Sequence, residues 1–530
     1  MSTVTLNKLT VTNPDGSTLF RDISVSFGNE KTGLVGNNGS GKSTIAKIIA
    51  GIKKPSEGKV ISEGKVSYLP QDLSPLNHLP VIDIFSLKEK YTAFKRINSG
   101  RGTPDDLIIL DNDWSIEDRI FSSMEQTGIK YISPERIFSS LSGGEKVRCL
   151  FASLLVQNPS FIILDEPTNH LDFSARKIIY NFVNEWKKGM LVISHDRTML
   201  RQMDKIAELS PLGLKLYGGN FDFYMSMKKL EDEAAEKKFQ SAEVSLKKDI
   251  KELEKAVARQ VKRTKTAAKN TPGSGIPKIL LNAKKGRGEN TLKKLKDIHN
   301  KRIEESAENL SDAKAKIHES RQIKIDLENS KVPRGKIIVR GAGLNYSWDG
   351  VNYLWQNDLS FQITGAERIL LKGNNGSGKT TLMRMINNEI LPLRGELYVG
   401  VLRIGILDQQ VSVLKDNLTL LENLKLYAPN TPEHELRIKL GRFLFYKDEV
   451  NKKSGVLSGG EKMRAGMACL LAADQSPELI MMDEPTNNLD LESIMELTSA
   501  LNSYKGALLV VSHDADFIKE IDIKREISVD

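Results

Sequence analysis

One nine-residue pattern occurs twice in this 530-residue chain and constrains its fold more than any other feature. Residues 36–44 read GNNGSGKST, and residues 373–381 read GNNGSGKTT. Both match G-x-x-x-x-G-K-[ST], in which glycines let backbone N–H groups surround phosphate oxygens at the start of a helix. A short apolar run precedes each loop and a helical apolar pattern follows it. The chain therefore contains two α/β nucleotide-binding units.

The repetition extends beyond these loops. LSGGEK recurs at 141–146 and 457–462, DEPTN at 165–169 and 483–487, and SHD at 194–196 and 512–514. Such ordered self-similarity predicts a duplicated domain. The offset between the copies falls from 338 residues at Gln71 and Gln409 to 316 residues at Leu141 and Leu457. Roughly 20 extra residues therefore lie in the first copy, and the turn-rich SGRGTPDD at 99–106 is expected to belong to them.

The residues of the two loops are suited to hold ATP with Mg²⁺. Lys42 and Lys379 supply positive charge, and the hydroxyls of Ser43 and Thr380 are expected to ligate the metal ion. The predicted ATP contacts are Gly36, Asn37, Asn38, Gly39, Ser40, Gly41, Lys42, Ser43 and Thr44, together with Gly373, Asn374, Asn375, Gly376, Ser377, Gly378, Lys379, Thr380 and Thr381.

Two apolar runs, FIILD and LIMMD, predict central parallel strands that end in a carboxylate. Asp165 and Asp483 are expected to hold Mg²⁺, directly or through water. The adjacent Glu166 and Glu484 are candidates to orient the attacking water and to accept its proton. Because both carboxylates are present in both copies, both sites are predicted to hydrolyse ATP.

LSGGEK, the DEPTN-x-LD block and SHD together resemble the ATP-binding cassette (ABC) superfamily over roughly residues 4–225 and 337–530. The resemblance implies that Gln71 and Gln409 sense Mg²⁺ and the attacking water, and that His195 and His513 are switch histidines. It also implies a signature that contacts the γ-phosphate bound by the opposite cassette, and a loop aspartate that couples the two sites. The matching residues are Ser142, Gly143, Gly144, Ser458, Gly459 and Gly460 for the signature, and Asp172 and Asp490 for the coupling loop.

In that superfamily the signature lies across a dimer interface. Two cassettes in one chain therefore imply an intramolecular sandwich in a monomer, in which Lys42 faces Ser458 and Lys379 faces Ser142. The superfamily usually stacks an aromatic residue on adenine upstream of the P-loop. In the second copy Tyr346, with Trp348 nearby, either serves this role or packs in the core. Asn13 stands near the corresponding place in the first copy.

The segment between the copies has a helical pattern. Leu246, Ile250, Leu253, Val257 and Val261 recur at three- and four-residue steps, as do Ile303, Ala307, Leu310 and Ile317. TPGSGIP at 271–277 interrupts them. Residues 226–336 are therefore expected to form two long antiparallel helices joined by a loop near 264–291. This linker separates a first domain over 1–225 from a second over 337–530.

Positive charge is concentrated at the predicted tip, at about 255–291. Residues 228–331 carry 27 basic and 17 acidic side chains, and no acidic residue occurs between Lys255 and Arg287. Such a stretch of one sign favours binding to a nucleic-acid phosphate backbone over an ordinary solvated hairpin. The candidate contacts are Lys255, Arg259, Lys262, Arg263, Lys265, Lys269, Lys278, Lys284, Lys285 and Arg287.

Tandem cassettes joined by a basic helical linker resemble the ABC-F family, as does YGGNFDFY at 217–224. The resemblance implies that the hairpin enters the ribosomal E site, that its tip approaches P-site tRNA and rRNA, and that ATP binding holds the docked state. Family members include housekeeping translation factors and proteins that confer antibiotic resistance by protecting ribosomes.

The alternative is a soluble ATPase subunit that energises a membrane ABC transporter, which would leave the basic hairpin without a role. DNA-repair members carry cysteine zinc modules, whereas Cys149 and Cys469 are the only cysteines here. Chromosome-organising members divide one cassette between the chain ends, whereas each copy here is complete. Two cysteines, no signal pattern and no long apolar run predict a cytoplasmic protein without membrane insertion.

Overall fold

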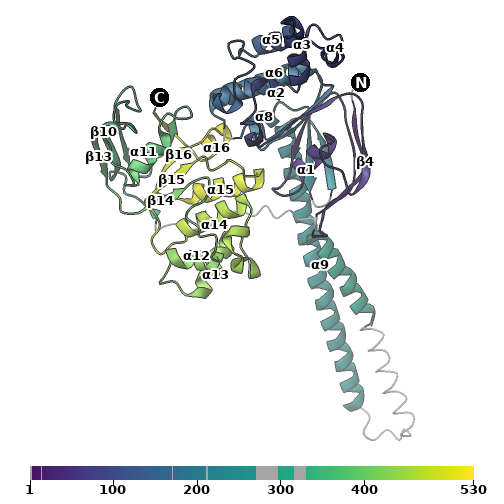
Figure 1. Cartoon of the computed structure of the whole chain (residues 1–530). Coiled ribbons are helices and arrows are strands. Elements are labelled where there is room, and N and C mark those ends of the chain that lie inside the picture. The colour runs from purple at the N-terminus through teal and green to yellow at the C-terminus, as the bar shows by residue number, and fades with distance from the viewer. Residues whose placement is uncertain are drawn as a thin grey trace. The chain divides into compact units, whose positions relative to one another are not determined.

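The computed structural model describes residues 3–13, 15–169, 171–210, 213–269, 297–314 and 330–529. The chain forms two compact units (Figure 1). One unit holds Met1–Asp222 together with Gln322–Asp530, and the other holds Phe223–Arg321. The first unit contains both copies of the α/β domain, which we call the first and second cassettes, and the second unit is helical.

Each cassette contains two sheets. In the first, an antiparallel sheet has the order β2–β1–β4, and a six-stranded sheet has the order β5–β6–β7–β3–β8–β9, with β9 antiparallel to β8. The antiparallel strands are β1 (Val4–Thr12), β2 (Thr18–Phe27) and β4 (Glu57–Ser62). The larger sheet consists of β3 (Lys31–Val35), β5 (Val66–Leu69), β6 (Phe161–Asp165), β7 (Gly189–Ile193), β8 (Lys205–Ser210) and β9 (Gly213–Gly218).

The second cassette repeats this topology. Its antiparallel sheet has the order β11–β10–β13, and its parallel sheet has the order β14–β15–β16–β12–β17, which matches β5–β6–β7–β3–β8. The strands are β10 (Ile337–Asn345), β11 (Leu359–Thr364), β12 (Arg368–Lys372), β13 (Arg394–Val399), β14 (Ile404–Leu407), β15 (Leu479–Asp483), β16 (Ala507–Val511) and β17 (Arg525–Ser528). The matching strand orders confirm the duplicated fold predicted from the sequence.

The helices of the two cassettes correspond except at the predicted insertion. Those of the first are α1 (Lys42–Ile49), α2 (Val81–Ile84), α3 (Lys88–Asn98), α4 (Pro104–Leu110), α5 (Ile116–Gln126), α6 (Gly143–Gln157), α7 (Phe173–Glu185) and α8 (Arg197–Leu200). Those of the second are α11 (Lys379–Ile386), α12 (Leu420–Tyr427), α13 (Glu433–Arg442), α14 (Gly459–Leu471), α15 (Leu491–Ser503) and α16 (Ala515–Glu520).

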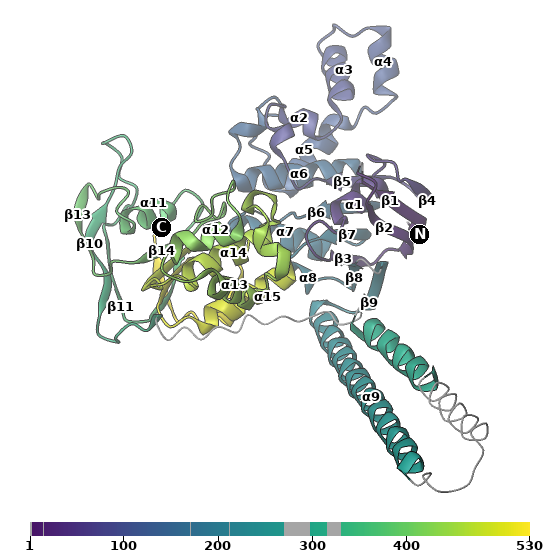
Figure 2. The ribbon, with the colours of Figure 1, turned by 90° about the horizontal axis from the view of Figure 1, so that it is seen from below.

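The extra residues of the first cassette form the helix pair α3–α4, which Figure 2 shows beyond α2 and α5. Only residues 99–103 of the predicted turn connect these two helices. Pro104 already lies in the first turn of α4, because Thr103 caps that helix in a reciprocal capping box with Asp106.

Buried strands place the predicted site residues at one edge of each parallel sheet. Every residue of β6 and β7 is buried, as the continuous apolar runs predicted. One core of the second cassette joins its antiparallel sheet to α11 and to strands β12, β15 and β16, and another joins α12–α16 to the opposite face. The carboxyl ends of β3 and β6, and of β12 and β15, therefore open toward the P-loop helices α1 and α11.

The helical unit contains α9 (Phe221–Lys269) and a helix over residues 297–314, which lie side by side in Figures 1 and 2. The Ser306 hydroxyl donates a 2.6 Å hydrogen bond to Asp249 Oδ2 between them. The predicted helical hairpin is thus confirmed, but α9 continues to Lys269, past the loop start predicted at 264.

The contact face of this hairpin also differs from the prediction. Leu246, Leu253 and Leu310 are half-buried as expected. Ile250, however, is 41% exposed, whereas its neighbour Asp249 is half-buried and accepts the hydrogen bond from Ser306. Val261 and Ala307 are exposed as well, and Ile317 lies outside the described residues.

Across the ranges given above, no helix combines the length and the apolar character needed to cross a membrane. Cys149 and Cys469 are buried and unbonded, and burial raises the pKa of each thiol to about 12. Neither thiol is therefore ionised near neutral pH.

Candidate functional site

Each P-loop runs from a buried strand into a helix, with a glycine at the helix start. Gly41 caps α1 with φ 101°, and Gly378 caps α11 with φ 92°, a left-handed conformation that favours glycine. A Cβ atom would lie 2.7 Å from the Leu19 side chain at Gly41 and 2.0 Å from the Leu354 side chain at Gly378. These two positions explain why the loop demands glycine before the lysine.

The side chains of the two P-loop lysines bond to the backbone of their own loops. Lys42 Nζ donates to the carbonyls of Gly36 at 2.7 Å and Asn37 at 3.1 Å, and Lys379 Nζ makes the equivalent bonds to residues 373 and 374. In the described part of the chain, the buried hydroxyls of Ser40 and Ser377 have no hydrogen-bond partner. A cationic amine beside an unpaired hydroxyl suits a phosphate ligand, which accepts hydrogen bonds from both.

The predicted magnesium ligands come together at the strand ends. Ser43 Oγ donates to Asp165 Oδ1 at 3.1 Å, and Thr380 Oγ1 donates to Asp483 Oδ2 at 2.9 Å. These oxygen donors suit Mg²⁺, which they would hold and which would neutralise charge on a bound phosphate. The Tyr68 hydroxyl also donates to Asp165 Oδ2 at 2.9 Å. The sequence analysis did not identify Tyr68, whose counterpart in the second cassette is Ile406.

The two candidate catalytic glutamates share an unusual backbone conformation. Glu166 has φ 47° and Glu484 has φ 48°, a left-handed conformation that costs a non-glycine residue about 1–2 kcal/mol. The Glu166 N–H donates to the carbonyl of Ile193 on the adjacent strand, and the Glu484 N–H donates to that of Val511. These bonds hold the turn that aims each carboxylate away from its strand.

Each switch histidine faces the glutamate of its own cassette. His195 Nε2 lies 3.4 Å from Glu166 Oε1, and His513 Nε2 lies 3.2 Å from Glu484 Oε1. Burial is the main cause that lowers the pKa of His195 to about 3 and that of His513 to about 4. Burial also raises the pKa of Glu166 to about 8 and that of Glu484 to about 7. Each contact therefore joins a neutral imidazole to a carboxyl group whose pKa is close to neutral pH.

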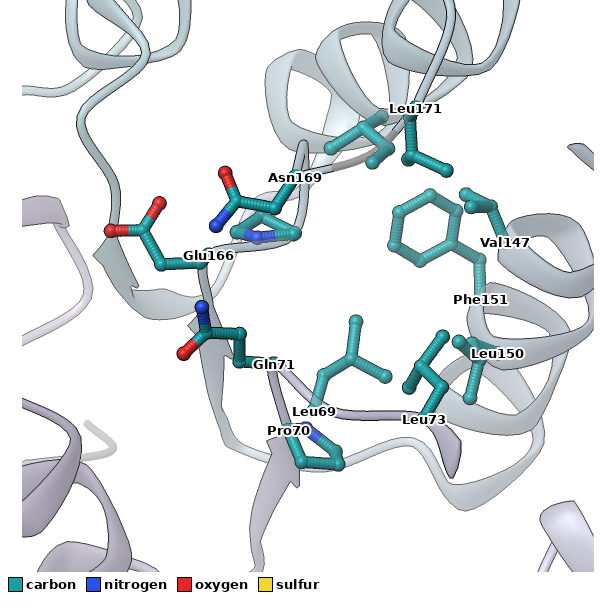
Figure 3. A pocket seen from close by; sticks show the side chains of 12 residues that line it. Leu69, Pro70, Gln71, Leu73, Val147, Leu150, Phe151, Glu166, Asn169 and Leu171 are labelled. Atoms are coloured by element: carbon teal, nitrogen blue, oxygen red, sulfur yellow. The ribbon is translucent and has the colours of Figure 1, made fainter. Parts of the chain in front are cut away.

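Gln71 lies on the same side of a small cavity as Glu166 (Figure 3). The opposite wall is apolar and consists largely of α6 side chains, including Val147, Leu150 and Phe151. The structure thus brings the predicted glutamine and glutamate of the first cassette together, next to the helix that begins at the signature.

The second cassette has a larger pocket around its P-loop. Lys379, Thr380, Gln409, Asp483 and Glu484 all line it, so these five predicted residues share one pocket. Its apolar wall includes Trp348 and Leu354.

The two aromatic residues upstream of this P-loop differ in their surroundings. Trp348 lines the pocket and is 62% exposed, whereas Tyr346 is partly buried and packs against the core. Their rings meet edge to face at 5.0 Å. The role of Tyr346 in nucleotide binding stays a prediction.

A tight turn occupies the corresponding segment of the first cassette. The Asn13 backbone N–H donates to the Ser17 carbonyl, the Gly16 N–H donates to the Asn13 carbonyl, and Asn13 Nδ2 donates to Ser17 Oγ at 3.0 Å. Described residues 15–18 of this turn are aspartate, glycine, serine and threonine.

Each P-loop contacts the coupling loop of the opposite cassette. The Asn38 backbone N–H donates to Asp490 Oδ2 at 2.8 Å, and the Asn375 backbone N–H donates to the Asp172 carboxylate. At the centre, Asn169 Nδ2 donates to Asn488 Oδ1 at 3.3 Å, a contact that the sequence analysis did not identify.

The signature serines begin helices. Ser142 caps α6 in a capping box with Glu145, and Ser458 caps α14 in a capping box with Glu461. The signature glycines 143–144 and 459–460 form the first turns of these helices. These turns therefore present helix N-termini, which are suited to bind anions.

Charged side chains provide further contacts between the cassettes. Arg201 donates to Asp516 through two bonds, at 2.7 and 3.0 Å, and also to Asp222 at 3.0 Å. Arg197 forms an ion pair with Glu520. Both arginines lie in or next to α8, and both acids of the opposite cassette lie in α16, so these two short helices meet at the interface.

The predicted nucleic-acid contacts fall only partly on described residues. The side chains of Lys255, Arg259, Lys262 and Arg263 are exposed on α9. The side chains of the others lie outside the described residues: Lys265, Lys269, Lys278, Lys284, Lys285 and Arg287.

Both copies of the repeat match a known protein family. A family model described as ABC transporter matches residues 20–169 and 356–487. The chain is 31% identical to the uncharacterized ABC transporter ATP-binding protein YkpA of Bacillus subtilis (strain 168), over 95% of this chain and 90% of that protein. It is 29% identical to ABC transporter F family member 5 of Arabidopsis thaliana, over 97% of this chain and 73% of that protein. The chain belongs to the F family of ABC proteins.

A solved ABC protein shows the same overall fold. Its structure is titled as the complex of archaeal ribosomal stalk protein aP1 and archaeal ribosome recycling factor aABCE1, and it matches with a TM-score of 0.53. Identity is 18%, over 98% of this chain and 86% of that one. Membership of the ABC family implies ATP binding, generally with Mg²⁺, and ATPase activity.

Proposed function

We propose that this ABC-F protein binds ATP at two composite sites between its cassettes and uses their closure and opening to act on the ribosome. One site would combine Lys42, Asp165 and Glu166 with the signature at Ser458, and the other would combine Lys379 and Glu484 with the signature at Ser142. The observation that carries this proposal is the reciprocal contact of each P-loop with the opposite coupling loop, through Asp490 and Asp172.

In each composite site, ATP with Mg²⁺ would lie between a P-loop and the opposite signature helix. Lys42 or Lys379 would neutralise phosphate charge, and Glu166 or Glu484 would orient the attacking water. The N-termini of α6 and α14 would face the γ-phosphate, where helix dipoles favour negative charge. Bound ATP would thus hold the cassettes together, and hydrolysis would release them.

The linker, proposed to span residues 226–336, would bind rRNA and P-site tRNA phosphates through its basic side chains. The exposed Lys255, Arg259, Lys262 and Arg263 on α9 support this part of the proposal, as does the excess of positive charge between the cassettes. A solved fold neighbour is titled as a ribosome recycling factor in complex with a ribosomal stalk protein. The action would regulate a translation step or protect ribosomes from antibiotics.

The test uses the full chain with Glu166→Gln and Glu484→Gln together, which should retain ATP binding but stop hydrolysis. With ATP, this variant is expected to sediment with 70S ribosomes, and Lys42→Ala with Lys379→Ala should abolish that association. If the trapped protein instead sediments with membrane vesicles and not with ribosomes, the chain is better explained as the ATPase subunit of a transporter.

Charge reversal tests the role of the hairpin. The four substitutions Lys255→Glu, Arg259→Glu, Lys262→Glu and Arg263→Glu should weaken ribosome binding most strongly at low salt, while ATP hydrolysis without ribosomes stays at the wild-type rate. A matched control reverses Lys228, Lys229, Lys237 and Lys238, near the start of the same helix. Equal loss with both sets would refute recognition by the tip.

A further inference from the structure

A tyrosine outside the predicted motifs contacts a predicted magnesium ligand of the first cassette. The Tyr68 hydroxyl donates a 2.9 Å hydrogen bond to Asp165 Oδ2, and Ser43 Oγ donates to Asp165 Oδ1 at 3.1 Å. A phenol is protonated at neutral pH and can therefore donate to a carboxylate. Each oxygen of this carboxylate thus has its own donor, one from strand β5 and the other from helix α1.

The register of the parallel sheet explains how Tyr68 reaches this carboxylate. Tyr68 on β5 pairs with Ile163 on β6, two residues before Asp165. Side chains two residues apart on a strand point to the same face, so all three residues share one face of the sheet. Two residues span about 6.6 Å along a strand, a distance that a tyrosine side chain covers and a serine or threonine does not.

Burial makes this hydrogen bond a fixed part of the site. Asp165 is only 1% exposed, and Tyr68 is partly buried and packs against the core of the first cassette. Water therefore competes little for the phenol, and the carboxylate cannot rotate without losing its bond to Tyr68. The oxygen that remains beside the P-loop is Oδ1, which accepts from Ser43.

The second cassette has the same strand register without the hydroxyl. Ile406 on β14 pairs with Met481 on β15, two residues before Asp483, and packs against the core. Thr380 Oγ1 donates to Asp483 Oδ2, as Ser43 does to its aspartate, but Ile406 has no group that could donate to the other oxygen. The two metal-binding carboxylates therefore differ in one donor, at one position of matched strands.

We propose that Tyr68 is a positioning residue for Mg²⁺ in the first ATP site, where its hydroxyl holds Asp165 Oδ2 and leaves Oδ1, beside Ser43, to hold the ion directly or through water. The assignment rests on the metal role proposed for Asp165, but it requires neither the composite sites nor the ribosome. A hydrogen bond to a metal-binding carboxylate fixes its orientation before the ion binds, and its loss typically lowers metal affinity about 10- to 100-fold.

The experiment measures how much free Mg²⁺ the first site needs in order to hold ATP. The full chain carries Glu166→Gln, which should stop hydrolysis at the first site, and Lys379→Ala, which should remove ATP binding at the second. Bound ATP is measured by equilibrium dialysis over a range of free Mg²⁺ concentrations and in excess EDTA. Tyr68→Phe should raise the half-saturating Mg²⁺ concentration about tenfold, and ATP binding in EDTA should stay unchanged.

Tyr217→Phe is the matched control, because a buried tyrosine usually finds a hydrogen-bond partner for packing alone. Tyr217 on β9 pairs with Ile206 on β8, and its hydroxyl donates at 3.1 Å to Glu208, two residues further along that strand. Both substitutions should lower the melting temperature by a similar amount, about 2–4 °C. Only Tyr68→Phe should raise the Mg²⁺ requirement. No rise with Tyr68→Phe, or an equal rise with Tyr217→Phe, would overturn the proposal.

Two further measurements separate this inference from the metal role of Asp165 itself. Asp165→Asn should raise the Mg²⁺ requirement more than Tyr68→Phe does. If Asp165→Asn leaves it unchanged, the metal role of Asp165 fails, and that of Tyr68 with it; if only Asp165→Asn acts, the role of Tyr68 alone fails. In protein with Lys42→Ala and Glu484→Gln, ATP binding reports the second site, where Tyr68→Phe should change nothing. An equal rise there would overturn a role specific to the first site.

Discussion

A buried ion pair in the second cassette allows a sharp test of stability. Arg464 Nη1 donates to both carboxylate oxygens of Glu496, at 2.9 and 2.8 Å, and joins the signature helix α14 to α15. The two side chains are only 19% and 8% exposed, and the guanidinium lies 5.0 Å from the centre of the Phe445 ring. The first cassette offers a matched control, because Arg148 stands at the equivalent position, where Ile178 replaces the glutamate.

Arg464→Met leaves the Glu496 carboxylate buried without its partner. Breaking such a pair by removing one member costs about 3–5 kcal/mol. At pH 8 we expect about 3 kcal/mol, because the carboxyl group can escape part of the penalty by binding a proton. For a domain of this size that corresponds to a loss of about 6–12 °C in melting temperature. Arg148 donates to the Gly128 carbonyl at 3.5 Å, so Arg148→Met should cost less than about 1 kcal/mol.

The penalty should depend on pH in a definite direction. Burial raises the pKa of Glu496 to about 7 from an ordinary value of 4.5, although Arg464 lowers it. The folded state thus holds this proton more tightly than the unfolded state, and wild-type stability falls as pH rises from 4.5 to about 7. Without Arg464 the pKa rises further, so the loss continues above pH 7. The difference between Arg464→Met and wild type should therefore be larger at pH 8 than at pH 6.

Hydrogen exchange measured by mass spectrometry can localise this effect. Peptides from α14 and α15 should lose protection in Arg464→Met, while α6 and α7 keep theirs. Adding Glu496→Leu should restore most of the stability, because an apolar pair can replace a buried ion pair. An equal penalty for Arg148→Met, or a penalty for Arg464→Met that does not grow between pH 6 and pH 8, would refute the reasoning.

Two further predictions concern the second ATP site. In Lys42→Ala protein, Trp348→Ala should weaken ATP binding about fivefold by equilibrium titration and leave triphosphate binding unchanged, since a stacked aromatic contributes about 1–3 kcal/mol. Tyr353→Ala in the same loop is the control, and equal effects of the two substitutions would contradict a stacking role for Trp348. Burial, Arg176 and Lys379 lower the pKa of His513 to about 4, so the folded state binds this proton less tightly than the unfolded state and loses stability as pH falls below 6.5. His513→Gln should therefore reduce the fall in melting temperature between pH 6.5 and pH 4. The ceiling of this effect is about 3 kcal/mol, and a wild-type and a variant curve that run parallel would contradict it.

The sequence sufficed for the fold because its signals are local and repeated. FIILD and LIMMD form buried strands at the predicted positions, and the change in offset places the insertion between Gln71 and Leu141, the interval that contains α3 and α4. Turn residues, apolar runs and caps act over a few neighbours, so one chain without relatives can report them. The hairpin was predicted for the same reason, although Ile250 and Val261 of the predicted α9 face are exposed and Asp249 bonds to Ser306 instead.

The sequence revealed less about contacts made by residues outside the motifs. Tyr68 lies 97 positions before Asp165, and Glu492 looks like an ordinary helical glutamate until its hydrogen bond with Asn37 of the first P-loop is seen. Asn488 resembles a spacer inside DEPTN-x-LD, yet it accepts hydrogen bonds from Asn38 and Asn169 of the other cassette. Such roles depend on the packing of two domains, which no local pattern encodes.

Fusion of the two cassettes explains why their interface can be symmetric in one place and asymmetric in another. In a homodimer with twofold symmetry, every contact occurs twice, so both partners must fit the same surface. Here the P-loop contacts of Asp172 and Asp490 are paired in that way. The Arg201–Asp516 pair is not, because its counterpart would join Lys519 to Thr198, which is uncharged.

In a contact between two different cassettes, a charge on one side needs no copy on the other. The same freedom allows Glu492 to accept a hydrogen bond from Asn37 of the first P-loop, while Ser174 stands at the equivalent position of the first cassette. Two P-loops with nearly identical sequences therefore meet different side chains at the start of helices α7 and α15, although the loops themselves are alike. A pair of identical cassettes could not acquire such a difference by substitution within the chain they share, whereas a fused pair can acquire it with one residue.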